Sequence, residues 1–355
     1  MNYFTKERLT STLKGATDFL ELNNSEKGSL VVSEYGGRPL GIFPKVGALN
    51  LLWVNPNLGR QIAQRSRDIG GDRYWLSPEQ TFFYKSPESW EGWFCPDGLD
   101  PANYTFTEQS DKRCVLESQI SVENQWTGEL YRGEVVRKMK VIDEPIKTGV
   151  NYFGMEYTDE CTLEHPDLNV NGWSLATVIS GGVKNPGTVL IPTKQESTPI
   201  SYFRSIPNER LHVDPDYVAY KIDVNEIYKL AIRPEDIAFT RKAKIGYVLR
   251  LPRSEEYGLL MKLSDDIPRS QDDCFDVARD HPDAEIGVVQ SYNSESPNTQ
   301  KLQFGEIELQ LKRFISSNGK SRGISTHQLL GYIKKKKKIL EVIEKYMGLE
   351  NPKLY

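Results

Sequence analysis

Two segments of the chain carry side chains whose types and spacing could do chemistry, and the first is residues 70–79, GGDRYWLSPE. Arg73 offers a rigid fork of N–H donors that suits paired oxygens, and Trp75 offers a flat apolar face with a polar edge. The paired glycines can take positive φ angles or let a ligand approach the backbone. With Asp72 and Glu79 beside them, these residues suit a ring with many hydroxyl groups, such as a sugar. A structural turn, with Arg73 paired to either carboxylate and Trp75 in the core, explains the same segment.

The second segment is residues 305–311, GEIELQL, in which glutamates alternate with apolar residues. In a strand, the apolar residues would share one face and Glu306 and Glu308 the other, with their Cα atoms roughly 6.6 Å apart. A carboxyl group beside apolar neighbours tends to have a raised pKa, which suits a general acid or base. Two exposed glutamates on a wet sheet face are the competing interpretation.

Aromatic side chains are concentrated between residues 75 and 106, where prolines and glycines interrupt them. Such a stretch predicts a long ordered loop. We expect Trp90 and Trp93 to join Trp75 in a pocket whose aromatic faces pack on the C–H patches of a sugar ring. The alternative is a satellite hydrophobic cluster that covers the end of a sheet.

Histidines are few, and the chain lacks the common catalytic motifs. His165 and His212 lie in polar, turn-rich contexts in which acid–base chemistry is feasible, although a surface histidine is the simpler interpretation of each. There is no H-x-x-x-H, G-x-S-x-G, P-loop or complete G-x-G-x-x-G sequence. These absences disfavour metal hydrolysis, serine hydrolysis, kinase chemistry and dinucleotide redox chemistry, so we expect neither a metal nor a cofactor.

The hydrophobic pattern predicts which elements position these groups. Near-helical spacing over the first twenty residues predicts a short N-terminal helix. The period then changes to two, as in residues 113–122 and 131–141, which is typical of antiparallel sheets with one wet face. Further strand-like runs are residues 29–34, 38–43, 49–54, 149–157, 174–180, 187–192, 217–224, 245–251, 257–263, 285–292 and 302–313. Because no long helices alternate with them, we predict an all-β fold, a large antiparallel two-sheet sandwich with short N-terminal and C-terminal helices.

The C-terminal part is expected to differ from the sandwich. Residues 316–326 are typical of a flexible linker, and the apolar stripe between residues 329 and 347 predicts an amphipathic helix that carries Lys334 to Lys338. The predicted domains are therefore an N-terminal helical segment (1–24), a β-sandwich sugar-binding domain (25–315), and a linker with a C-terminal helix (316–355). The lysine run is interpreted as a solvated helix face; a surface for anionic partners is the alternative.

Net charge and cysteine spacing limit the classes of protein that fit this sequence. The formal net charge of −4 argues against a dedicated nucleic-acid binder. The N-terminus lacks the apolar core of a secretory signal, and no charge-free span of ~18 residues predicts a membrane segment. The four cysteines include no C-x-x-C pair, which favours reduced thiols. We therefore expect a cytoplasmic protein without nucleic-acid or membrane partners.

Several segments resemble the galactose mutarotase-like (aldose 1-epimerase-like) proteins, in particular their poorly characterised bacterial members. The likeness lies in residues 51–56 (LLWVNP) and 70–79, in the paired-glycine turn that precedes Arg38, and in the strand at residues 305–308. It extends over residues 25–315. The resemblance implies a β-supersandwich with a sugar cleft on a concave sheet.

The resemblance also implies roles for individual residues. In such mutarotases a glutamate takes the proton of the anomeric hydroxyl, a histidine protonates the ring oxygen, and an arginine positions the sugar. By motif and order along the chain, Arg73 would be the positioning residue, Glu306 or Glu308 the base, and His165 the acid. The family's histidine–aromatic–asparagine signature is absent around His165, and Glu-Ile-Glu replaces its Leu-Glu-Pro-Gln-type segment.

The expected function is that of a carbohydrate-active protein, an aldose 1-epimerase-like enzyme that acts at the anomeric centre by general acid/base catalysis. A non-catalytic carbohydrate-binding protein of the same fold, and a glycan lyase or hydrolase, remain alternatives. The expected partner is a small sugar or a glycan, and the oligomeric state is not predicted. The predicted substrate-binding residues are Arg38, Asp72, Arg73, Trp75, Glu79, Trp90 and Trp93.

Overall fold

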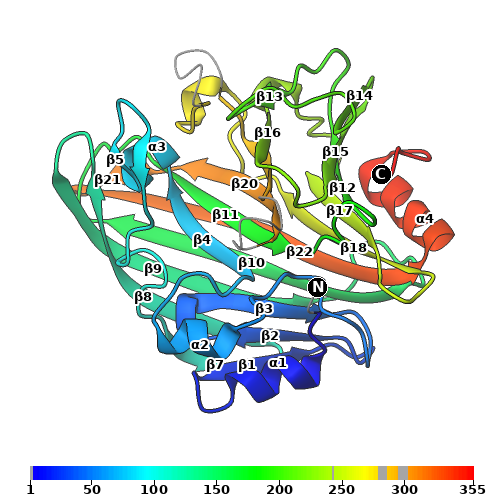
Figure 1. The fold of residues 1–355 in the computed structure, drawn as a ribbon. Helices are drawn as coiled ribbons and strands as arrows, with labels where there is room; N and C mark the ends of the chain where they lie inside the picture. Colours follow the sequence, from blue (N-terminus) through cyan, green and yellow to red (C-terminus); the bar gives the residue numbers. More distant parts are fainter. Residues whose placement is uncertain (1–2, 242–243, 279–285, 295–302) are drawn as a thin grey trace.

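Antiparallel strands dominate the chain (Figure 1). The computed structural model describes residues 3–241, 244–278, 286–294 and 303–355. Within these ranges the strands form a large sheet of eleven strands, a second sheet of six, an N-terminal sheet of three and a two-stranded hairpin. The predicted all-β, two-sheet antiparallel sandwich with a helix near each end is confirmed.

The large sheet runs across the molecule in Figure 1, from β8 and β9 on the left to β15 on the right. Its strands follow the order β14 (Leu211–Asp214), β15 (Tyr217–Ile222), β12 (Gly187–Pro192), β17 (Ile245–Arg250), β18 (Glu256–Ser264), β22 (Lys320–Lys335), β10 (Asn151–Leu163), β9 (Glu129–Ile142), β8 (Arg113–Asn124) and β7 (Thr105–Gln109), and β21 (Ile315–Ser317) pairs with β22. Buried residues alternate with more exposed ones along β8 and β9, as the period of two predicts.

The second sheet lies over the large sheet, and the hydrophobic core lies between them (Figure 1). Its order is β13 (Ile200–Ser201), β16 (Tyr228–Ile232), β19 (Val289–Asn293), β20 (Gly305–Arg313), β11 (Asn171–Val178) and β4 (Asp72–Ser77). In β20, Ile307 and Leu309 belong to this core. Strand alternation therefore turns Glu306 and Glu308 together to the outer face of the second sheet.

Shorter elements form the N-terminal end of the chain and connect the strands of the two sheets. The N-terminal sheet consists of β1 (Phe19–Asn23), β2 (Ser29–Ser33) and β3 (Arg38–Phe43), and it lies beside α1 (Lys6–Leu13) and α2 (Leu58–Ala63) (Figure 1). After β4 come α3 (Glu79–Phe83) and the hairpin of β5 (Tyr84–Ser86) and β6 (Glu91–Trp93). Three 3-10 turns cover Tyr35–Gly37, Pro234–Asp236 and Gln271–Asp273.

The C-terminal helix α4 (Lys336–Met347) packs on the outside of the large sheet. It buries Ile339, Ile343 and Met347 in a second core that includes Tyr332 of β22 and Leu259 of β18. The strands of this half of the sheet are therefore covered on both faces, which accounts for the continuously buried residues of β12 and β17.

Three local predictions need correction. Residues 316–326 are not a linker, because they form β21 and the start of β22, a 16-residue strand paired with β10 and β18. The buried positions there are small, such as Ser321 and Ser325, so they gave no apolar period. The lysine run is divided between the end of β22 and the start of α4. The first helix is shorter than predicted: it ends at Leu13, and Phe19 and Leu20 belong to strand β1.

Two further segments differ from their predicted form. Residues 75–106 are not one loop, since they include the end of β4, all of α3 and the β5–β6 hairpin. Residues 49–54 contribute isolated bridges, such as that between Leu52 and Val178, but no named strand. Residues 285 and 302, at the starts of two predicted runs, lie outside the described residues.

Two observations concern the predictions made from the cysteines and from the lack of a charge-free span. All four cysteines (Cys95, Cys114, Cys161 and Cys274) are free. Among the described residues, no helix is both long enough and apolar enough to span a membrane.

Buried charges connect the two sheets. Asp72 of β4 and Lys262 of β18 are fully buried, with 2.8 Å between Oδ2 and Nζ, and Lys262 Nζ also donates to Ser174 Oγ of β11 at 2.6 Å. Burial alone would raise the pKa of Asp72, but Lys262, with smaller contributions from His327 and Arg137, outweighs it and lowers that pKa. Nearby, Arg137 Nε donates to Asp159 Oδ1 at 2.8 Å. Removing one partner of such a pair would leave an uncompensated buried charge.

The paired glycines before β4 bring that strand against the N-terminal sheet. Gly70 and Gly71 have φ angles of +88° and +84°. A Cβ on Gly71 would lie 2.2 Å from the carbonyl oxygen of Pro39, which is closer than any real contact. The close backbone approach predicted here is therefore made to the protein's own chain.

We expect Gly71→Ala to lower the free energy of unfolding by more than about 3 kcal/mol, because it combines backbone strain with a clash. Gly47→Ala is the matched control, since Gly47 has a φ of +69° and a Cβ added there would meet no atom within 4 Å. The control should lose only about 1–2 kcal/mol. Urea unfolding of both variants measures the difference, and equal losses would contradict the role of Gly71 in this turn.

Candidate functional site

A cleft of about 500 Å³ opens on the outer face of the second sheet. Seven of its lining residues are aromatic and five are charged: Tyr84, Trp75, Trp93, Trp173, Phe203, Tyr292 and Phe304, and Arg67, Arg73, Glu79, Lys229 and Glu306. Leu175 and Ile227 complete the lining. A larger hollow of about 1110 Å³ lies elsewhere, around Arg8 and Arg253, but its charged residues are all exposed and it gathers no buried polar group.

Strand register places the polar side chains of the cleft in rows across the second sheet. One row consists of cross-strand partners from β16, β19, β20 and β11, namely Lys229, Tyr292, Glu306 and Thr177. The next row, from β19, β20, β11 and β4, consists of Gln290, Glu308, Leu175 and Arg73. Directly opposed residues have Cβ atoms only about 4.5–5.5 Å apart. Distant parts of the sequence therefore meet on one face.

Arg73 and Glu306 form a buried ion pair in the cleft. The guanidinium also lies 4.3 Å from the centre of the Trp75 ring, a cation–π arrangement. Trp75 Nε1 donates to Asp100 Oδ2 at 2.8 Å, and Asp100 pairs in turn with the fully buried Arg38. This chain of contacts fixes both the indole face and the carboxylate that the arginine holds.

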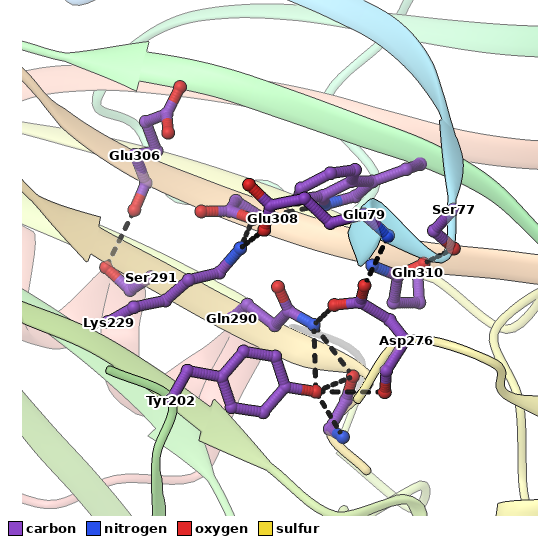
Figure 2. Close-up of polar contacts among 12 residues, drawn as sticks. Ser77, Glu79, Tyr202, Lys229, Asp276, Gln290, Ser291, Glu306, Glu308 and Gln310 are labelled. Carbon is purple, nitrogen blue, oxygen red and sulfur yellow. Dashed lines mark hydrogen bonds and ion pairs between the residues drawn. The ribbon is translucent and has the colours of Figure 1, made fainter. Parts of the chain in front are cut away.

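A second polar group surrounds Lys229 (Figure 2). Its Nζ lies 3.3 Å from Glu79 Oε2 and 3.5 Å from Glu308 Oε2. Trp93 Nε1 donates to the other oxygen of Glu79 at 3.0 Å, and Trp173 Nε1 donates to Glu308 Oε2 at 3.1 Å. The two carboxyl groups are thus held by indole N–H groups on either side of one ammonium.

Burial and the crowding of carboxyl groups shift the pKa values here. Burial raises the pKa of Glu308 to about 8; Lys229 opposes this rise, and Glu306 and Glu79 add to it. Burial alone would lower the pKa of Lys229, but Glu308 and Glu79 outweigh it and raise that pKa. These surroundings favour the neutral form of Glu308 and the ammonium form of Lys229.

Five predicted site residues line the cleft: Arg73, Trp75, Glu79, Trp93 and Glu306. Glu308 lies beneath the lining, in contact with Lys229 and Trp173. Two other predicted residues lie behind the cleft lining. Arg38 pairs with Asp100, and Trp90 packs edge-on against Tyr84 with ring centres 5.1 Å apart. Their roles toward a ligand stay predictions.

Two predicted residues lie away from the cleft. Asp72 precedes Arg73 in a strand, so it points to the opposite face, where it pairs with Lys262 between the sheets. His165 follows the end of β10, and its Nε2 lies 2.9 Å from Glu129 Oε1. Its hydrogen bond to the Pro166 carbonyl, with that to Glu129, raises the pKa of His165. Order along the chain suggested His165 as the acid, but the fold does not bring it to Glu306.

Several residues of the cleft were not predicted from the sequence, above all Lys229 and Trp173. Lys229 lies in the run Tyr228–Ile232, and a lysine in such an apolar strand is a usable sign of a buried charge partner. Asp276 was also missed; it accepts from the backbone N–H of Glu79 at 2.9 Å and from Gln290 Nε2 at 2.7 Å. No sequence pattern marks it.

Within the part of the chain that the structure describes, no group of three or more histidine, cysteine, aspartate or glutamate side chains is arranged to hold a metal ion. The cleft instead offers indole and phenyl faces, an ion-paired carboxylate and the buried ammonium of Lys229. Fold and site together define an all-β, two-sheet protein with a cleft of aromatic and charged side chains on the outer face of the second sheet.

Comparison with known proteins gives one family and several distant structures. The sequence model of a family described as "Family of unknown function (DUF6786)" matches residues 4–161. None of the curated proteins matches the chain. Among solved structures, a GalM/aldose epimerase homologue from C. elegans has 10% identity and a TM-score of 0.45, over 90% of this chain and 99% of its own.

Two further solved structures are similar at equally low sequence identity. The galactose 1-epimerase of Lactobacillus acidophilus has 8% identity and a TM-score of 0.45, over 89% of this chain and 94% of its own. A TPR-domain containing protein from Parabacteroides distasonis has 10% identity and a TM-score of 0.39, over 90% of this chain and 47% of its own. Likeness this remote carries no argument about activity, and the expected closeness to bacterial members stays a prediction.

The pKa of Glu308 makes a testable prediction about stability. Its folded value of about 8 exceeds the value of about 4.3 for an unfolded glutamate. The contribution of Glu308 to stability is therefore fully present below about pH 4.3 and is lost as pH rises through about 8. We expect Glu308→Gln to be as stable as the wild type near pH 5 and more stable at pH 9, by urea unfolding.

The exposed Glu123 provides the control. Glu123→Gln should follow the wild-type dependence on pH at every point. A Glu308→Gln protein whose stability runs parallel to the wild type between pH 5 and pH 9 would show that Glu308 is ionised throughout.

Proposed function

We propose that the chain is a carbohydrate-active protein that binds a pyranose in this cleft and acts at its anomeric centre by general acid/base catalysis. The observation that carries the proposal is the convergence of the Arg73–Glu306 ion pair with three indole rings on one sheet face. The fold alone would not support it, since one fold serves many functions.

The lining suits a sugar in both of its chemical aspects. The C–H faces of a pyranose pack on flat apolar rings, and Trp93 presents 41% of its surface at the mouth of the cleft. The hydroxyl groups need placed donors and acceptors, which Arg73, Glu79 and Lys229 supply. A few polar groups among aromatic walls are typical of a specific small-molecule site.

Glu306 is the group that would act as base. Its carboxylate, held by the ion pair with Arg73, can accept the proton of an anomeric hydroxyl. The bond between C1 and the ring oxygen then breaks as that oxygen takes a proton from an acid. Closure of the rotated aldehyde by the reverse steps gives the other anomer. Lys229 is the protonated amine that lines the same cleft.

A sugar-binding protein without turnover is the second candidate. It is favoured by one observation: among the residues that the structure describes, no histidine lines the cleft. His165 lies beside Glu129, and His327 lies between the sheets, 2.7 Å from Asp159. The two candidates share the ligand and differ in whether the anomers exchange.

We expect the protein to accelerate exchange between α and β anomers of an aldose, measured by NMR magnetisation transfer across a panel of common sugars. Glu306→Gln should slow the exchange by about 10²-fold or more, because it removes the base and keeps the shape. Its affinity for the sugar, from calorimetry, should change little by comparison.

Two tryptophan variants test whether the sugar binds in this cleft. Trp93→Ala should weaken sugar binding roughly tenfold, about 1.4 kcal/mol, whereas Trp126→Ala, on a side chain that is 52% exposed and outside the cleft lining, should not. Saturable binding without exchange would favour the non-catalytic candidate. No binding of any sugar by the wild type would count against both.

The expected cytoplasmic location stays a prediction. Four unpaired cysteines support a reducing compartment, since thiols in oxidising compartments tend to pair.

A further inference from the structure

Three polar atoms beneath the cleft are fully buried and have no hydrogen-bond partner among the described residues. They are Glu308 Oε1, Gln290 Oε1 and Gln310 Nε2. Leaving a buried polar atom unpaired costs about 1–3 kcal/mol, so each one requires an explanation. All three belong to β19 and β20 and lie on the face that carries Glu306.

Gln290 and Glu308 are direct cross-strand partners, so their side chains start about 4.5–5.5 Å apart at Cβ. The orientation of the Gln290 amide is fixed by its Nε2, which donates to Asp276 Oδ2 at 2.7 Å and to the Gly287 carbonyl at 2.9 Å. Because both partners are acceptors, exchange of the amide nitrogen and oxygen would set acceptor against acceptor. Oε1 is therefore left as an acceptor on the other side of the amide, as Figure 2 shows for Gln290 beneath Glu308.

Two oxygens that only accept cannot bond to each other, but one proton between them satisfies both. Glu308 Oε2 already accepts from Trp173 Nε1 and faces Lys229 Nζ, so the free position for a proton is Oε1. The charges that face Glu308 are Lys229 from β16, Arg73 from β4, Glu79 from α3 and Glu306 from β20. Asp276, which accepts from Gln290 Nε2, is a further buried carboxyl group that faces Lys229. The other carboxyl groups of the cluster therefore already outnumber its two cations, which leaves no need for a negative charge on Glu308.

We propose that Glu308 is held as a neutral carboxylic acid by a hydrogen bond from its Oε1–H to Gln290 Oε1, and that it supplies the proton which Lys229 delivers to the sugar ring oxygen. This inference rests on the proposed function. It gives the cleft an acid in place of the histidine that the described lining lacks.

The proton transfers balance as follows. Glu306 takes the proton of the anomeric hydroxyl, the bond between C1 and the ring oxygen breaks, and the ring oxygen takes a proton from Lys229 Nζ. Lys229 then regains a proton from Glu308, whose carboxyl group turns so that its protonated oxygen takes the place of Oε2, 3.5 Å from Nζ, and Glu308 becomes a carboxylate beside the ammonium. Ring closure reverses each transfer and returns the proton to Glu308. Glu308 thus acts through Lys229, which is the group that lines the cleft.

Side-chain carboxyl ¹³C NMR on the full-length protein tests the pair without any ligand. We expect the carboxyl of Glu308 to titrate near pH 8 and Gln290→Met to lower that midpoint by about one unit or more, because the acceptor for the neutral form is lost. Gln310→Met is the matched control, since Gln310 lies two residues along β20 and its Oε1 accepts from Ser77 Oγ at 2.5 Å. It should leave the midpoint unchanged.

Two results would overturn the pairing between Glu308 and Gln290. A midpoint near 4 in the wild type, or a midpoint that rises in Gln310→Met and stays constant in Gln290→Met, would mean that Gln310 donates to an ionised Glu308. If Gln290→Met does not fold, the wild-type titration alone decides.

Delivery through Lys229 is tested by anomer exchange. We expect the wild-type rate to fall as pH rises through about 8, and Glu308→Gln to slow exchange about 10²-fold with the sugar affinity kept within about threefold. Exchange at the wild-type rate and with the wild-type pH profile in Glu308→Gln would overturn the inference and leave the proposed function standing. Sugar binding without exchange in the wild type overturns delivery, and no sugar binding defeats the proposed function itself.

Discussion

The ion pair between Arg73 and Glu306 is the contact on which the candidate site depends. It joins residues 233 positions apart, from β4 and β20, which are not neighbours but lie on either side of β11. A guanidinium and a carboxylate can meet there only if β4, β11 and β20 keep their register and turn the same face outward. The inward residues of these strands, such as Leu76 and Ile307, fix that face by entering the core. The arrangement of the cleft is thus a consequence of burying the opposite side of the same strands.

Charges on both faces of β4 must be compensated, because the strand is buried throughout. Asp72 on the inner face is matched by Lys262 and Arg73 on the outer face by Glu306. A buried ion pair adds little stability relative to apolar residues, yet losing one partner is costly. The inner pair orients the sheets, whereas the outer pair lies against a cleft that a ligand can enter. The different surroundings, rather than different residue types, separate a structural pair from a candidate functional one.

Period-two alternation was enough to predict the sandwich and the common face of Glu306 and Glu308, because those signals are local. The segment at residues 70–79 was predicted to hold substrate-binding residues, and Asp72 and Arg73 were grouped together because they are adjacent; in β4 they point to opposite faces. His165 was placed by its order along the chain, and order does not say which sheet a segment joins; His165 follows β10, which belongs to the large sheet and contributes no residue to the cleft lining. Lys229 and Gln290 could not be assigned, because their roles arise only from the pairing of β16, β19 and β20.

The six tryptophans allow the most direct test of the claim that this cleft holds a sugar. Trp75, Trp93 and Trp173 line it, and Trp53, Trp90 and Trp126 do not. Each gives one indole ¹⁵N–¹H signal, which can be assigned by substitution and followed during titration with a panel of sugars. We expect saturable shifts of the Trp93 and Trp173 signals with an unmoved Trp126 signal. Titrations that leave the three cleft signals in place, or that move only Trp126, would show that the sugar does not bind here.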